Sequence, residues 1–296
     1  MRRGKRMPRF ALPVALCILC AGLALTARAG SADASARSTA RQLLDRAGIS
    51  GGLVVHLGCG DGRLTAALRA NERYVVHGLD ADFSQVREAR DYIRSQDLYG
   101  PVSVQHLSDA RLPYSGNLVD LLVVSEAGSI PESEITRVLA PQGVAMVRRG
   151  GSWKKRTKPW PADIDEWTHW RHGPGRNPVA EDTVIGPPRR LQWVGAPRWQ
   201  THHNTTPSLN AMVSAGGRMF YIVNDIPPGV RGLPGKWSLV ARDAFNGTLL
   251  WRRPVPEWGW EQWSNDQMAG RFNKPIHLSR RLVASGDRVF VTLGFN

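Results

Sequence analysis

Three glycines spaced two residues apart, Gly58, Gly60 and Gly62, directly follow a short apolar run. This pattern is typical of a buried parallel strand that ends in a loop whose backbone passes close to a bound nucleotide. Asp80 stands at the end of the next apolar run, and Asp109 follows the third. A carboxylate just past a strand end can accept two hydrogen bonds from vicinal ribose hydroxyls. The three glycines are therefore candidate residues of a nucleotide site, and the two carboxylates follow strands of the same predicted sheet.

The elements that must position these residues alternate in type along residues 35–150. Strands are expected at 53–57, 74–79, 102–106, 118–124 and 144–148, and helices at 35–47, 62–70, 83–98 and 131–139. Strands alternating with helices form a parallel sheet with crossover helices, and ligands bind at the carboxyl ends of the strands. The sequence thus predicts an α/β Rossmann-like domain that brings the candidate residues to one edge of its sheet.

Four features of this domain occur in the order found in class I S-adenosylmethionine-dependent methyltransferases, which residues 35–150 resemble. They are the loop Leu57-Gly58-Cys59-Gly60-Asp61-Gly62, the acid Asp80, the triplet Ser108-Asp109-Ala110 and the segment Ile135 to Val147. The resemblance implies S-adenosylmethionine as cofactor. It places the glycine loop against that cofactor, Asp80 at the ribose hydroxyls and Asp109 on the adenine side.

Some features depart from the pattern of that family. His56 stands where the family usually has an acid near the cofactor's ammonium group, and a histidine supplies no fixed negative charge. No helix and hairpin are expected after the fifth strand to complete the usual seven-stranded sheet. The catalytic residues stay unassigned: Glu126 is a candidate general base, with a plain loop acid as the alternative. Cys59 is expected to fill space in the turn.

The N-terminus has the parts of a secretory signal peptide over residues 1–29. Five basic residues and no acid lie among the first nine, an apolar run spans 10–25, and Ala27-Arg28-Ala29 follows. The run is shorter than the roughly twenty residues of a spanning helix, so no stable membrane span is expected after cleavage; a retained anchor is the alternative. Cleavage would leave Cys59 as the one cysteine, without a disulfide. The predicted location is periplasmic or secreted.

The basic residues lack the arrangement expected of a nucleic-acid site. The chain carries 39 basic and 25 acidic residues, for a net charge of +14. The densest basic run, Lys154-Lys155-Arg156-Thr157-Lys158, is expected to be a solvated linker, and no lysine–arginine block interleaves with aromatic residues. Nucleic acid is therefore not expected as a partner.

A change in composition near residue 151 marks a domain boundary. All 11 tryptophans lie between Trp153 and Trp263, and residues 151–204 are rich in tryptophan and proline. We expect this segment to be a linker that wraps against a neighbouring domain. Glu166, His169 and His172 could meet at a metal if they shared a helical face, but hydrogen-bonded structural histidines are the favoured alternative, so no metal site is predicted.

Residues 205–296 carry the pattern of antiparallel strands. Hairpins are expected at Ala215-Gly216-Gly217-Arg218 and, with a two-residue turn, at Asn246-Gly247, the next strand beginning at Thr248. A phrase that begins at Val213 recurs seventy residues later at Val283. The segment also matches Ala-x-Asp-Ala-x-x-Gly-x-x-x-Trp, through Ala241, Asp243, Ala244, Gly247 and Trp251.

This phrase resembles the repeat of pyrroloquinoline-quinone-type β-propellers. The resemblance implies an all-β, incomplete β-propeller segment, because a closed propeller needs about four to eight blades, and the chain is therefore expected to be an N-terminal fragment. Most carriers of the repeat bind no quinone, so pyrroloquinoline quinone is not expected in this fragment.

Together these features predict an exported β-propeller repeat protein that acts as a binding or scaffold protein. Its methyltransferase-like domain would be degenerate, and its propeller would contact a protein or another component of the cell envelope. Two alternatives remain open. One is an active S-adenosylmethionine-dependent methyltransferase, and the other is a quinoprotein dehydrogenase-like enzyme.

Overall fold

The computed structural model describes residues 12–184, 187, 191–196, 209–225, 236–256, 258 and 281–293; of residues 12–29 and 210 only the backbone is described. The basic head of the expected signal peptide and the last three residues of the chain lie outside this part. Within the described residues, no helix has both the length and the apolar character needed to cross a membrane.

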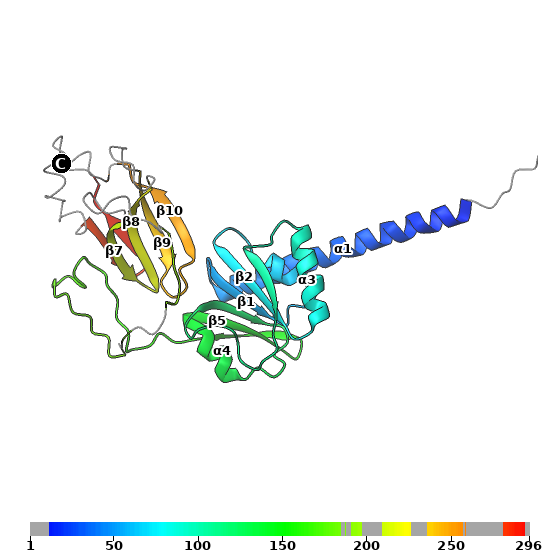
Figure 1. Cartoon of the computed structure of the whole chain (residues 1–296), viewed down its shortest axis with the longest axis horizontal. Coiled ribbons are helices and arrows are strands. Elements are labelled where there is room, and N and C mark those ends of the chain that lie inside the picture. The colour runs from blue at the N-terminus through cyan, green and yellow to red at the C-terminus, as the bar shows by residue number, and fades with distance from the viewer. Residues whose placement is uncertain are drawn as a thin grey trace, which may run out of the picture.

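Six strands form the sheet of the first domain, in the order β3-β2-β1-β4-β5-β6 (Figure 1). The strands are β1 (Gly52–Leu57), β2 (Tyr74–Asp80), β3 (Val102–His106), β4 (Val119–Val124), β5 (Leu139–Arg149) and β6 (Ser152–Thr157). The helices are α1 (Leu12–Ala47), α2 (Arg63–Ala67), α3 (Phe83–Ser95) and α4 (Glu132–Val138). Because β1 to β5 are parallel, the expected Rossmann-like fold is confirmed.

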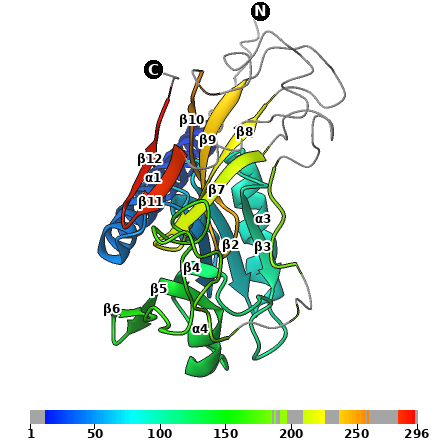
Figure 2. The same ribbon diagram turned by 90° about the vertical axis from the view of Figure 1, so that its left-hand side faces the viewer.

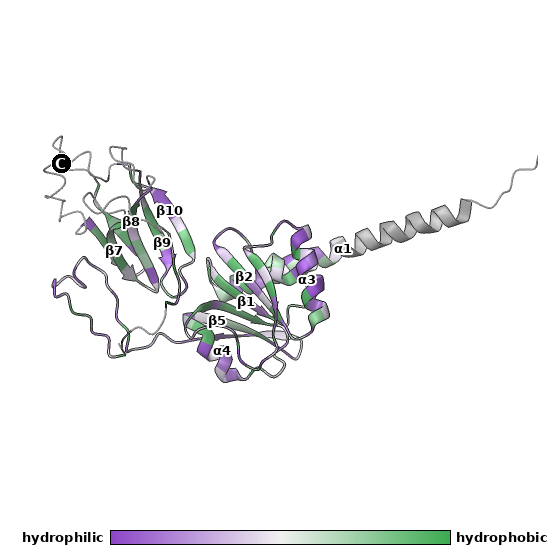
Figure 3. Cartoon of the chain, in the orientation of Figure 1, coloured by the Kyte–Doolittle hydropathy of each residue, from purple (hydrophilic) through white to green (hydrophobic). Residues whose placement is uncertain are grey.

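The central strands β1 and β4 are buried on both faces, and the sheet around β1 is mostly hydrophobic in Figure 3. Val54 and Val123 belong to the cluster that includes residues of α1, α2 and α3. Val55 and Val124 face the opposite cluster, which includes residues of α4. This explains why both strands are nearly continuous apolar runs instead of alternating ones.

Helix α1 begins much earlier than the expected helix at 35–47. It runs from Leu12 through the expected cleavage point at Ala29, and its first half projects away from the rest of the chain (Figure 1). Eight alanines between positions 21 and 40 favour an uninterrupted helix, so Ser35 does not cap it. The helix ends at Ala47 as expected, and its buried residues lie at helical spacing: Ala40, Leu43, Leu44 and Ala47.

Two expectations at the far side of the sheet are wrong. The basic run expected to be a linker forms β6, which pairs antiparallel with β5. Its side chains are mostly exposed, as suits a charged edge strand that discourages pairing with other chains. Strand β5 also begins at Leu139 instead of 144, because the turn-like residues near Gln142 form an irregularity within the strand instead of a break.

The second part of the chain contains a four-stranded antiparallel sheet in the order β10-β9-β8-β7 (Figure 2). Its strands are β7 (Leu209–Ala215), β8 (Arg218–Asn224), β9 (Trp237–Asp243) and β10 (Leu249–Pro254); β11 (Leu282–Ser285) and β12 (Arg288–Val291) form a separate hairpin. The recurring phrase occupies equivalent places in the two hairpins. Ala215 pairs with Arg218, and Ser285 with Arg288, with left-handed glycines at Gly216 and Gly286.

The loop between β9 and β10 is longer than expected. Asn246-Gly247 does not form a two-residue turn, because β9 ends at Asp243 and β10 begins at Leu249. The Asp243 carboxylate accepts hydrogen bonds from the backbone N–H groups of Phe245 and Asn246, at 2.8 and 2.9 Å. Asp243, the aspartate of the repeat phrase, therefore stabilises a five-residue loop. The Asn-Gly pair alone predicted a shorter, two-residue turn.

This loop contacts the first domain at the amino ends of its central strands. Asn246 Nδ2 donates to the Leu118 carbonyl at 3.0 Å and to Asp120 Oδ2 at 2.6 Å. Asp120 Oδ2 also accepts from the Leu53 N–H at 2.6 Å. The second sheet thus touches the edge of the Rossmann sheet opposite to the carboxyl ends of the strands.

Candidate cofactor site

The glycine loop joins β1 to α2 in a conformation that requires glycine. Gly58 and Gly62 have φ values of +73° and +80°. A Cβ at Gly58 would lie 2.8 Å from the Glu126 backbone nitrogen, and one at Gly62 would lie 2.8 Å from Ala89 Cβ. The loop is therefore packed tightly against the start of the β4–α4 loop on one side and against α3 on the other.

Asp80 holds this loop to the end of β2. Its Oδ2 accepts from the Gly60 N–H at 2.9 Å, and its Oδ1 accepts from the Asp82 N–H at 3.0 Å. Each carboxylate oxygen still has a lone pair for another donor. At Gly60 the nearest atom to an added Cβ would be 3.7 Å away, so the outer face of the loop is open.

Asp109 and Glu126 lie at the same edge without joining the loop's hydrogen bonds. Asp109 is exposed in the segment after β3, and among the described residues its carboxylate accepts one hydrogen bond, from the Ser108 hydroxyl at 3.4 Å. Glu126 is exposed after β4, directly beside Gly58. The five candidate residues therefore belong to one sheet edge, and the candidate base lies next to the first glycine.

His56 forms a buried polar network beneath the loop that sequence reasoning missed. Its Nδ1 lies 2.8 Å from Thr65 Oγ1, and its Nε2 lies 2.8 Å from Ser125 Oγ. Burial lowers the pKa of His56 to about 4, so the ring is neutral at pH 7. The network connects β1, α2 and the loop after β4. A single polar residue inside a buried apolar strand was the sequence signal for it.

Replacing His56 with phenylalanine is expected to lower the free energy of unfolding by about 1–3 kcal/mol, because it leaves the buried Thr65 hydroxyl unpaired. The pH dependence has a definite sign. Between pH 6.5 and about 4, His56 becomes protonated in the unfolded chain but stays neutral in the folded protein. The free energy of unfolding therefore decreases as pH falls through this range. Urea unfolding from pH 7 to 4 measures this loss. A phenylalanine variant whose stability keeps the same slope as the wild type would contradict the role of His56.

Cys59 is not a nucleophile in this arrangement. It is buried in the loop, and burial together with the nearby Asp80 charge raises the pKa of its thiol to about 12. The thiol therefore stays protonated at pH 7, and the expected packing role of Cys59 agrees with its position.

His169 and His172 of the Trp-rich segment do not share a helical face. His169 and His172 pair in an isolated bridge instead of sharing a helix, and His172 Nε2 lies 2.5 Å from Asp165 Oδ2. Among the described residues, no three histidine, cysteine, aspartate or glutamate side chains are grouped as metal ligands. The segment packs on the second sheet, where the Trp167 N–H donates to Ser214 Oγ at 2.9 Å.

The residues at the carboxyl edge fit S-adenosylmethionine. The open face at Gly60 allows close approach of a nucleoside, and the free lone pairs of Asp80 can accept from vicinal hydroxyls. The one mismatch is His56, which is neutral and fully engaged, so it offers no charge to an ammonium group.

Comparison with known proteins bears on the same part of the chain. Residues 54–143 match a family described as methyltransferase domain. The chain is 33% identical over 119 residues to methyltransferase GfsG of Streptomyces halstedii, and it spans 42% of the length of that curated relative. The chain therefore carries a class I methyltransferase-like domain.

Two solved structures show partial likeness to the chain. A putative S-adenosyl-L-methionine-dependent methyltransferase from Methanococcus maripaludis is 23% identical, with a TM-score of 0.35, over 38% of this chain and 53% of that one. A geranyl diphosphate C-methyltransferase from Streptomyces coelicolor, solved with S-adenosyl-L-homocysteine, is 20% identical, with a TM-score of 0.34, over 37% and 42%.

Proposed function

We propose that the first domain binds S-adenosylmethionine at the carboxyl edge of its sheet and is an S-adenosylmethionine-dependent methyltransferase. The observation that carries the proposal is the Asp80 carboxylate, which holds the glycine loop while keeping lone pairs for a sugar. The match of residues 54–143 to a methyltransferase family supports an active enzyme better than the degenerate scaffold expected from sequence. When bound, the cofactor would supply an electrophilic methyl group.

The chain's own residues would bind and orient the cofactor. Gly58, Gly60 and Gly62 would let the backbone approach it, Asp80 would accept from the ribose hydroxyls, and Asp109 would lie on the adenine side. Glu126, exposed beside Gly58, would take a proton from a methyl acceptor. The neutral His56 would not act on the acceptor, since its two nitrogens are already hydrogen-bonded.

Calorimetric titration of the full chain with S-adenosylmethionine tests the proposal. Binding in the micromolar range is expected for the wild type. Asp80→Ala should weaken it at least tenfold, since the variant loses both the sugar acceptor and the anchor of Gly60. Asp91→Ala is the matched control, because Asp91 is an exposed carboxylate on α3 that pairs with Arg94. Absence of heat at millimolar cofactor, or equal loss in both variants, would refute cofactor binding at this edge.

We further propose that β7–β10 are one propeller blade and that the protein is exported, with a protein or cell-envelope partner on the propeller side. The antiparallel order of β7–β10 and the recurring hairpin at β11–β12 support the blade. Contact of the second sheet with the amino edge leaves the cofactor edge free of it. Fractionation of cells that express the full chain tests export: cytoplasmic protein with an uncleaved N-terminus would exclude it.

A further inference from the structure

Two hydroxyl groups share one neutral imidazole beneath the glycine loop. Thr65 Oγ1 lies 2.8 Å from His56 Nδ1, and Ser125 Oγ lies 2.8 Å from His56 Nε2. A neutral imidazole has one N–H that donates and one bare nitrogen that accepts. One hydroxyl therefore donates to the ring and the other accepts from it. The hydroxyl that accepts keeps its own proton for another partner.

The burial of the two hydroxyls decides between these arrangements. Thr65 is fully buried, and among the described residues His56 Nδ1 is the one hydrogen-bond partner of its hydroxyl. Buried donors in native proteins nearly always have an acceptor, so Thr65 donates to Nδ1. The ring proton is then on Nε2 and is donated to Ser125 Oγ. The opposite tautomer would leave the Thr65 proton buried without an acceptor, which is costly.

Ser125 is only half-buried and lies at the carboxyl edge of the sheet. It directly follows β4, and its N–H donates to the Leu57 carbonyl at 2.9 Å, which places it beside the end of β1. Its oxygen accepts from His56, and within the described part of the chain its own proton has no acceptor. A hydroxyl that accepts one hydrogen bond is polarised and becomes a stronger donor. The network therefore leaves a fixed hydrogen-bond donor at this edge.

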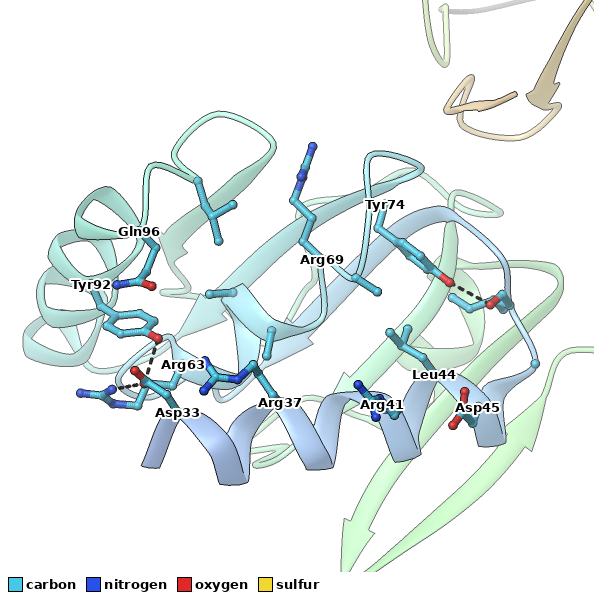
Figure 4. A pocket seen from close by; sticks show the side chains of 16 residues that line it. Asp33, Arg37, Arg41, Leu44, Asp45, Arg63, Arg69, Tyr74, Tyr92 and Gln96 are labelled. Atoms are coloured by element: carbon cyan, nitrogen blue, oxygen red, sulfur yellow. Dashed lines mark hydrogen bonds and ion pairs between the residues drawn. The ribbon is translucent and has the colours of Figure 1, made fainter. Parts of the chain in front are cut away.

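Other donors near the loop are already used by the protein. Four backbone N–H groups of the loop donate to carbonyl or carboxylate oxygens: those of Gly58, Cys59, Gly60 and Gly62. Arg63, which follows the loop, is ion-paired with Asp33 and, at 3.0 Å, with Asp61. Figure 4 shows the Arg63 side chain next to Asp33 and Tyr92, at one end of a cavity beside α1. The Ser125 hydroxyl is thus a donor that a ligand can use without breaking a contact of the protein.

The strand order determines which part of the cofactor would face Ser125. Strand β1 lies between β2 and β4, so Ser125 lies across β1 from Asp80, at the end of β2. With the ribose at Asp80, as proposed above, the part of the cofactor on the β4 side is its methionine part. The sulfonium and ammonium groups of that part accept no hydrogen bond, whereas its carboxylate does. A hydroxyl donor at this place therefore matches the carboxylate.

We propose that Ser125 donates a hydrogen bond to the carboxylate of S-adenosylmethionine and that His56 is the positioning residue that holds Ser125 for it. The inference rests on the proposed cofactor site. It also gives a role to the histidine that stands where the resemblance leads us to expect an acid: the site recognises the carboxylate of the methionine part instead of its ammonium. Burial lowers the pKa of His56 to about 4, so the neutral ring persists at physiological pH.

Calorimetric titration of the full chain with three ligands tests the proposal. They are S-adenosylmethionine, its decarboxylated form and 5′-methylthioadenosine, which keeps only the nucleoside part. Ser125→Ala should weaken binding of S-adenosylmethionine about tenfold, because a hydrogen bond to a charged group is lost. It should leave the affinity for each of the other two ligands unchanged. Ser129→Ala, which changes an exposed serine of the same loop, is the matched control and should bind all three as the wild type does.

The comparison separates the role of Ser125 from the cofactor site itself. An equal loss for all three ligands would mean that Ser125 only supports the loop, and no loss for S-adenosylmethionine would mean that the carboxylate does not contact it. Either result overturns the inference while the cofactor site stands. If the wild type binds neither S-adenosylmethionine nor 5′-methylthioadenosine, the cofactor site is refuted and the inference with it.

Nitrogen-15 NMR of the histidine rings tests the positioning role of His56 independently of any ligand. The His56 signals are those that are absent from His56→Phe. We expect the ring proton on Nε2, and the same tautomer from pH 7 to 5. A proton on Nδ1 would contradict the inference, since Ser125 would then donate to the ring and not to a ligand.

Discussion

Gly62→Ala is expected to destabilise the first domain by about 2–5 kcal/mol. A left-handed backbone costs a residue with a Cβ about 1–2 kcal/mol, and forcing a methyl group into a packed contact costs about 1–3 kcal/mol more. The new Cβ would lie 2.8 Å from Ala89 Cβ and 2.9 Å from Ala89 Cα, atoms held by α3, so no side-chain rotation can relieve the clash.

Gly60→Ala is the matched control for this prediction. Its φ is +53°, but an added Cβ would meet nothing nearer than Gln85 Oε1 at 3.7 Å, so we expect a cost of only about 1–2 kcal/mol. Urea unfolding followed by far-UV circular dichroism measures both, because the described helices α2, α3 and α4 all lie in the first domain. Equal destabilisation by the two variants would contradict the packing of α3 on Gly62.

Asp120→Ala is expected to destabilise the contact between the two parts of the chain by about 2–5 kcal/mol. The carboxyl accepts from the Leu53 N–H and from Asn246 Nδ2, each at 2.6 Å, and both donors would be left without it. Asp120→Asn should keep most of this stability, since its carbonyl oxygen can accept from the same donors.

The same site predicts a pH dependence. Burial and the nearby Asp243 charge raise the pKa of Asp120 well above 3.8, and the two side chains hydrogen-bond to each other. As pH rises above 3.8 the unfolded Asp120 loses its proton while the folded one keeps it, so the free energy of unfolding falls towards the raised pKa. The difference between wild type and Asp120→Asn isolates this effect from that of His56.

Unfolding followed by tryptophan fluorescence between pH 4 and 9 provides the measurement, since ten of the 11 tryptophans lie beyond β6. We expect Asp120→Asn to gain stability relative to the wild type as pH increases. A constant difference across this range would show that Asp120 is not protonated in the folded protein.

The Rossmann sheet was predictable from sequence because its strands are apolar runs that lie between helical segments, and Val102–His106 has the predicted bounds. The location of the glycine loop and of Asp80 at one edge of this sheet was also predictable, from their spacing in the sequence. Distant pairings were not predictable. The basic run that begins at Lys154 forms strand β6 because it pairs with the edge of β5, a contact that its own sequence does not specify.

The buried polar contacts were also hidden from local patterns. His56 forms a hydrogen bond with Ser125, which is 69 residues away in the sequence, and Asp120 forms one with Asn246, which is 126 residues away. Each was visible in the sequence as one polar residue within an apolar strand. The hydrogen-bond partners of these residues could not be predicted, because the free-energy cost of burying a polar group can be offset by a hydrogen bond to a residue anywhere in the sequence.

Hydrogen–deuterium exchange of the full chain, with and without saturating S-adenosylmethionine, tests most directly whether the carboxyl edge is a cofactor site. We predict slower exchange in peptides that cover residues 57–62 and 80–84, and unchanged exchange in those that cover β7–β10. Unchanged exchange at the glycine loop, or protection confined to the second sheet, would contradict a methyltransferase cofactor site in the first domain.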